Sequence, residues 1–60
     1  MCLATVYKSD DNAVLFRNVS RIDVEGETVF VRDIIGEEKT VKGSVVMVDL
    51  ANSVVKIKCD

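Results

Sequence analysis

The chain has 60 residues with eight Lys and Arg, ten Asp and Glu, no histidine and a formal net charge of −2. A chain this short forms one domain, and without histidine it lacks histidine general bases, Ser-His and Cys-His dyads, and zinc sites of mixed Cys and His ligands. The slight acidic excess argues against nucleic-acid binding. Because no apolar stretch approaches the ~18 residues of a membrane span and the first residues do not resemble a secretory leader, we expect a cytoplasmic protein.

The composition favours β-strands, since valine contributes twelve residues, isoleucine four and proline none. Alternation of side chains between two faces predicts a first strand at residues 2–8, and the turn-forming residues 9–12 end it. A second strand is predicted at 13–19. A third, in which charged and apolar residues alternate, is predicted at 21–25.

The second half of the chain continues this pattern of short strands. Gly26 lies where a tight hairpin requires a positive φ angle, and the charged residues 37–39 predict a solvated loop. Only residues 18–23 and 34–39 are compatible with a single helical turn. Further strands are predicted at residues 28–33, 40–42, 44–50 and 54–59.

About six short strands laid out as a flat sheet would leave exposed edges. A small, strongly bent, SH3-like antiparallel barrel is the simplest closure, so the predicted fold class is all-β and residues 1–60 form one barrel domain. Phe16 and Phe30 are predicted to lie in its core. Because a domain of this size has a marginal core, we expect it to be supported by a partner subunit.

Cys2 is the candidate site residue, although a free cysteine is most often a small buried apolar residue. If the cell removes Met1, the α-amine and the thiolate of Cys2 can close a five-membered chelate ring on a transition metal. If Met1 stays, its amine, the deprotonated Cys2 amide and the Cys2 thiolate can serve instead. Two such chain starts at the axis of a homodimer would together suit a square-planar ion, and this donor set does not distinguish Ni(II) from Cu(II).

The second cysteine, Cys59, has three interpretations, which are in order of preference a passive apolar residue, a bridge to the first cysteine, and an additional sulfur donor. Two cysteines are fewer than a secreted disulfide scaffold usually carries. The carboxylates of Asp10 and Asp11 lack the oxygen-ligand spacing of a calcium site, so a solvated turn is preferred there. Glu37 and Glu38 are interpreted in the same way.

Two other functions remain open at this point. The first is an RNA-binding SH3-like module, in which a basic strand face works with possible stacking partners. The residues concerned are Lys56, Lys58, Arg17, Arg32, Tyr7 and Phe16. Lysines on a terminal strand, however, more often block edge-to-edge aggregation. The second is a passive subunit of a larger assembly.

Several segments spread over nearly the whole chain resemble the CooT family. They are Met1-Cys2-Leu3-Ala4-Thr5-Val6, Ile22, Val24-Glu25-Gly26, Val29, Val31, Ile34-Ile35-Gly36-Glu37-Glu38, Gly43 and Val48-Asp49-Leu50. The resemblance implies a small cytoplasmic nickel-binding protein with an SH3-like fold that dimerises, linked to the maturation of carbon monoxide dehydrogenase. The family's metal ligand is the cysteine after the initiator methionine, which here is Cys2.

This resemblance therefore implies a non-enzymatic metallochaperone that holds Ni(II) through Cys2 at a homodimer interface. Its expected partners are carbon monoxide dehydrogenase or the proteins that mature it. Related sequences have also been labelled predicted RNA-binding proteins, which agrees with the alternative above at the level of fold alone.

Overall fold

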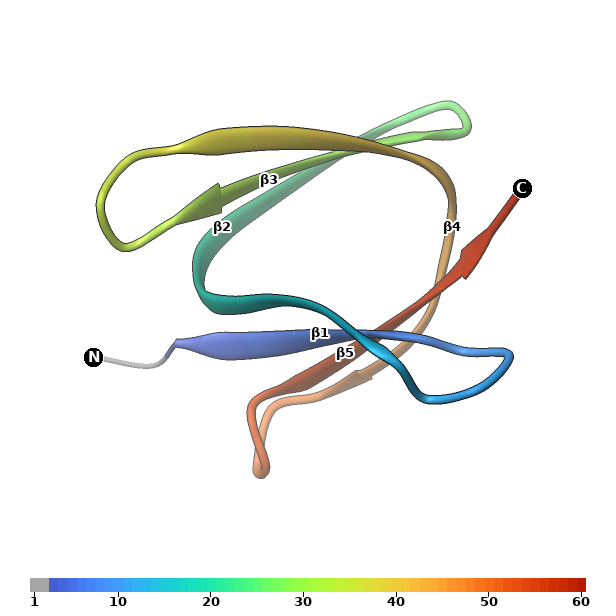
Figure 1. The fold of residues 1–60 in the computed structure, drawn as a ribbon, viewed down its shortest axis with the longest axis horizontal. Coiled ribbons are helices and arrows are strands. Elements are labelled where there is room, and N and C mark those ends of the chain that lie inside the picture. Colours follow the sequence, from blue (N-terminus) through green and yellow to red (C-terminus); the bar gives the residue numbers. More distant parts are fainter. Residues whose placement is uncertain (1–2) are drawn as a thin grey trace.

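The computed structural model describes residues 3–60, which form five strands that close into one barrel in chain order (Figure 1). The strands are β1 (Ala4–Lys8), β2 (Val14–Glu25), β3 (Thr28–Asp33), β4 (Glu38–Asp49) and β5 (Val54–Cys59). The predicted all-β barrel is confirmed. These residues contain no helix, and so none with the length and apolar character of a membrane span.

The ring is closed by a pairing that the sequence pattern does not reveal. β1 through β5 pair antiparallel in succession, and β1 then pairs parallel with β5. The number of strands also differs from the expected six or so, because β2 and β4 are each twelve residues long and uninterrupted.

β2 bends sharply and is shared between two neighbours. Its first part pairs with β1 and its second part with β3, and Val19 at the change of partner pairs with both Ala4 and Asp33. Asn18, immediately before it, has a φ of 55°, a conformation that asparagine tolerates better than most residues. The predicted end of a strand near residue 19 is therefore a bend within one strand.

β4 bends in the same way at Gly43. Residues 38–42 pair with β3, and residues 43–49 pair with β5. The Gly43 N–H donates a hydrogen bond to the carbonyl oxygen of Glu27 at 2.7 Å, which fixes the corner against the β2–β3 turn. Gly43 was predicted to separate two strands, but it is the corner of the single strand β4.

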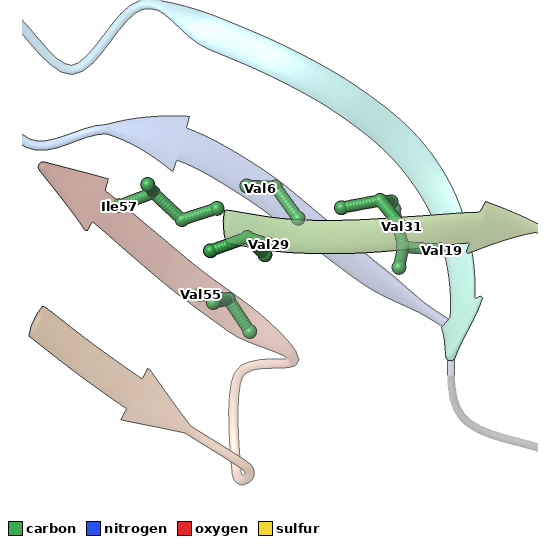
Figure 2. Packing of buried hydrophobic residues seen from close by; sticks show 6 residues of the cluster. All are labelled: Val6, Val19, Val29, Val31, Val55 and Ile57. Atoms are coloured by element: carbon green, nitrogen blue, oxygen red, sulfur yellow. The ribbon is translucent and has the colours of Figure 1, made fainter. Parts of the chain in front are cut away.

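Among residues 3–60, six buried aliphatic side chains form the core, and β1, β2, β3 and β5 contribute them (Figure 2). They are Val6, Val19, Val29, Val31, Val55 and Ile57. Fully burying an aliphatic side chain contributes about 1.5–3 kcal/mol, so six of them give a small core, as expected for this length.

Of the two phenylalanines predicted to be buried, one is not. Phe16 is half-buried and packs against the core, but Phe30 is 39% exposed. On β3 it alternates with the buried Val29 and Val31, so it must point out of the barrel. The prediction for Phe30 was wrong because alternation outweighs hydrophobicity at this position.

Two predicted turns form as expected, whereas the loop predicted at residues 37–39 was wrong for Glu38 and Lys39, because β4 begins at Glu38 and pairs with β3 there. Gly26 has a φ of 59° and begins the two-residue turn between β2 and β3, as expected. In the β1–β2 turn the Asp11 carboxylate accepts a hydrogen bond from the Ala13 N–H at 3.0 Å, and Asn12 has a φ of 58°. These aspartate and asparagine residues thus shape a solvated turn.

Candidate functional site

The candidate ligand Cys2 lies outside the residues that the structure describes, so the site is described from Leu3 onward. The start of β1 is held against the β4–β5 turn, because the Thr5 N–H donates a hydrogen bond to the Ser53 carbonyl oxygen at 2.9 Å. Leu3 therefore begins the described chain at the end of the barrel where β5 also begins.

An apolar groove of about 590 Å³ lies at this end of the barrel. It is lined by residues of β1, β2, β4 and β5 and of the segments next to them, and its main apolar members are Leu3, Ala4, Ile22, Val24, Val48 and Leu50. Three of them are largely exposed, Val24 at 57%, Val48 at 56% and Leu50 at 83%. Contiguous exposed apolar surface of this kind marks an interaction site.

Among the described residues, the lining of the groove carries positive charge but no negative charge. Arg21 is its single charged lining residue among those described, and no carboxylate lines it. Arg21 Nε also donates to the Asp23 carboxylate at 2.9 Å outside the lining, in an exposed ion pair. The described lining of the groove therefore offers no carboxylate to a hard cation.

One wall of the groove is shaped by the turn between β4 and β5. The Asp49 carboxylate accepts hydrogen bonds from the side-chain amide of Asn52 at 2.9 Å and from its backbone N–H at 3.1 Å. These bonds lower the pKa of Asp49 because they favour its charged form, and the bond from the Asn52 side chain has the largest effect. The turn that carries Leu50 and Ser53 into the groove is held in this way.

Cys59 is far from this end of the barrel. Thr5 pairs with Val54 in a parallel arrangement, and Cys59 is the last residue of β5, so it lies at the other end of that strand from the start of β1. It is half-buried, faces Gly43 across the β4–β5 ladder and packs against the core. This position favours the passive apolar interpretation.

The acidic residues considered for metal binding have other partners or lie in turns. Asp10 is exposed in the β1–β2 turn, Glu38 pairs with Arg32, and Glu37 approaches Lys39 at 3.7 Å. Over residues 3–60, no group of three or more Asp, Glu or Cys could hold a metal ion. The described part of the chain therefore has no self-contained metal site.

Of the residues considered for RNA binding, one lies apart from the basic strand β5 and two are engaged by other side chains. The β1–β5 register places Tyr7 beside Lys56, but Arg32 lies on β3, which pairs with neither strand, and is engaged by Glu38. Phe16 is half-buried under the ammonium of Lys39, whose Nζ is 5.6 Å from the ring centroid. Arg32 and Phe16 are thus engaged by other side chains of the barrel.

Sequence reasoning did not predict the apolar groove, because its walls come from segments far apart in the chain. One local signal was present. Leu50 follows a strand directly and enters a turn, where polar residues are the rule. An apolar side chain that is 83% exposed in such a turn indicates a contact with another molecule.

Comparison with known proteins agrees with the resemblance noted in the sequence. A search of curated proteins found no match. The crystal structure of a protein from Carboxydothermus hydrogenoformans, described as a "putative CooT", superposes with a TM-score of 0.88 over 98% of each chain at 16% sequence identity, and so has the same fold. The family described as CO dehydrogenase accessory protein CooT matches residues 1–58. The chain therefore belongs to the CooT family of CO dehydrogenase accessory proteins.

Proposed function

We propose that this protein is a nickel-binding metallochaperone that holds Ni(II) through Cys2 at a homodimer interface and serves the maturation of a nickel enzyme such as CO dehydrogenase. Family membership supports the link to CO dehydrogenase. The observation that carries the rest is the exposed apolar groove beside Leu3, the residue that follows the proposed ligand.

The donor chemistry of the chain start suits nickel as cargo. An amine and a thiolate from each of two protomers give the mixed nitrogen and sulfur set that square-planar Ni(II) accepts. The surroundings are compatible with it, since the groove walls are apolar and no described carboxylate lines them to attract calcium or magnesium.

The apolar groove also supports the proposal of a homodimer. A core of six aliphatic side chains leaves a 60-residue domain marginally stable, while Val24, Val48 and Leu50 stay exposed in one groove. Burial of this groove against a second copy would stabilise the fold and would place each chain start at the dimer interface. A monomer provides only half of the donors.

The protein is proposed to act without catalysis and in the cytoplasm. Its role is to bind a metal and pass it to a partner, which is CO dehydrogenase or another protein of its maturation. Such a role requires no general base, in keeping with a sequence that has no histidine.

The experiment that tests this proposal is a nickel titration of the native chain and of Cys2→Ser, followed by the thiolate-to-nickel absorption band and by native mass spectrometry. We expect one nickel per dimer for the native chain and none for the variant. Cys59→Ser is the matched control, and it should bind nickel like the native chain because Cys59 packs against the core. Undiminished nickel uptake by Cys2→Ser would refute the assignment.

A further inference from the structure

The loop between β3 and β4 presents two exposed isoleucines. Ile34 is 54% exposed and Ile35 is 80% exposed. Acidic residues flank this Ile34–Ile35 tip, with Asp33 before it and Glu37 after it. Exposing two adjacent branched aliphatic side chains in a charged loop has no benefit for the isolated barrel, so the tip is a candidate contact.

The tip is held in place by hydrogen bonds to Asp33 and Asn18. The Asp33 carboxylate accepts hydrogen bonds from the Ile35 N–H at 3.0 Å and from the Glu37 N–H at 2.9 Å, and the Gly36 N–H donates to the Asp33 carbonyl oxygen at 3.0 Å. The Ile34 N–H donates to the Asn18 carbonyl oxygen at 2.9 Å. A tip ordered before binding loses little conformational entropy when it docks.

The tip and the apolar groove adjoin each other at the bend of β2. Asn18, which holds Ile34, is followed by Val19 and Ser20, and both of these line the groove. The Ser20 hydroxyl donates to the carbonyl oxygens of Arg32 at 3.2 Å and Asp33 at 3.1 Å, which ties the groove wall to the strand that leads into the tip. Tip and groove are therefore parts of one continuous surface.

The two parts are complementary in shape and in the sign of the charge beside them, although within each chain Arg21 pairs with Asp23 and Glu37 approaches Lys39. The groove is concave, apolar and carries Arg21 as its single charged lining residue among those described, whereas the tip projects, is apolar and is flanked by the carboxylate of Glu37. A twofold-symmetric contact requires one surface that contains both complementary parts, because each protomer must present what the other receives. A second copy of this chain meets this requirement, because its surface carries both the tip and the groove.

We propose that the Ile34–Ile35 tip of each protomer docks in the apolar groove of its partner, so that two reciprocal contacts form the homodimer. This inference rests on the dimer of the proposed function and adds the residues that build it. In this arrangement the partner's Ile34–Ile35 tip fills the groove beside the chain start. The Glu37 carboxylate of one protomer then lies toward Arg21 of the other.

The test measures the dimer dissociation constant of three glutamate variants by analytical ultracentrifugation without nickel. Ile35→Glu alters the tip and Val48→Glu the groove, and each should weaken dimerisation on the order of a hundredfold, because the charge enters both symmetry-related contacts. Val46→Glu is the matched control, since Val46 is exposed on the same strand as Val48 but does not line the groove, and it should dimerise like the native chain.

Mixing the two weakened variants gives a sharper result. A heterodimer of Ile35→Glu and Val48→Glu retains one native contact, the intact tip of the Val48→Glu chain in the intact groove of the Ile35→Glu chain. We expect the mixture to associate more tightly than either variant alone. Loss of dimer in both variants without this recovery, an unweakened Ile35→Glu dimer, or a native chain that is monomeric would each overturn the inference.

Two controls keep the result interpretable. If either glutamate variant loses the β-sheet circular dichroism of the native chain, Ile35→Ala and Val48→Ala replace the pair, with the same expected direction and the same recovery on mixing. Cys2→Ser separates this inference from the proposed function. A Cys2→Ser chain that dimerises through tip and groove but binds no nickel supports both. One that dimerises through tip and groove yet still binds nickel overturns only the function. An unweakened Ile35→Glu dimer overturns only the docking.

Discussion

Gly43 and Lys58 approach so closely across the β4–β5 ladder that a β-carbon built on Gly43 would lie 2.2 Å from the Lys58 carbonyl oxygen. No side chain can move to relieve this contact, because the opposing atom belongs to the backbone of β5. Gly43 also has a φ of 157°, which side-chain-bearing residues rarely adopt. The bend of β4 therefore depends on this glycine.

Gly43→Ala is accordingly expected to destabilise the barrel by about 1–3 kcal/mol, the usual range for overpacking. In a domain of this size each kcal/mol shifts the thermal midpoint by about 4–8 °C, which circular dichroism resolves. Gly26→Asn is the control, because Gly26 has open space around it and a φ of 59° that asparagine tolerates. A Gly43→Ala variant that melts with the native midpoint would show that the two strands separate at little cost.

The Asp49–Asn52 contact predicts a pH-dependent contribution to stability. The hydrogen bonds from Asn52 lower the pKa of Asp49 in the folded state, so this contribution is present above the unfolded pKa and is lost as the pH falls through the folded value. Asn52→Ala removes the side-chain donor. Urea unfolding should therefore separate the native chain from Asn52→Ala at pH 7, and the gap should narrow in acid. An equal gap at both pH values would contradict this origin.

The core predicts a graded response at Ile57, which is fully buried. Ile57→Val should cost about 0.5–1.5 kcal/mol and Ile57→Ala about 2–5 kcal/mol, because the neighbouring strands relax only partly around the deleted groups. Ile35→Val is the matched exposed substitution and should leave the free energy of unfolding nearly unchanged, provided that the protein is diluted to its monomer. Chemical unfolding at low protein concentration measures all three. Equal effects at positions 57 and 35 would mean that the barrel interior is not packed as described.

Nickel affinity is expected to fall as the pH is lowered. An α-amine and a thiol are mostly protonated below about pH 8, and both must lose their protons to bind the metal. Between pH 8 and pH 6.5 we therefore expect the dissociation constant of the nickel complex to rise by more than about tenfold. Competition with a chelator of known pH dependence measures it, and Cys59→Ser should show the same slope. A pH-independent affinity would exclude the proposed donors.

The strand pattern predicted much of the barrel because alternation is a local property. The buried faces formed by Val29 and Val31 and by Val55 and Ile57 are read directly from the period of two. The breaks expected after residue 19 and at Gly43 made the predicted number of strands too high, because a break in the pattern marks a bend as well as an end. Whether a break is a bend or the end of a strand depends on the neighbouring strands with which the segment pairs.

The groove and the parallel closure lay beyond local reasoning. Leu3, Val24, Val48 and Leu50 meet only after β1, β2 and β4 have been placed, and no spacing in the sequence relates them. The pairing of β1 with β5 likewise joins the first and last strands of the chain. The candidate ligand Cys2 was recognised from its chemistry and from the family resemblance.

The position of β5 has a consequence for synthesis of the protein. It is the last strand of the barrel, yet it pairs with both β1 and β4. Until it leaves the ribosome, the nascent chain has two unpaired sheet edges and lacks Val55 and Ile57 from its interior. Closure must therefore follow translation of β5, and a polypeptide cut short by even one strand would be exposed to proteases and to edge-to-edge association rather than persist as a smaller barrel.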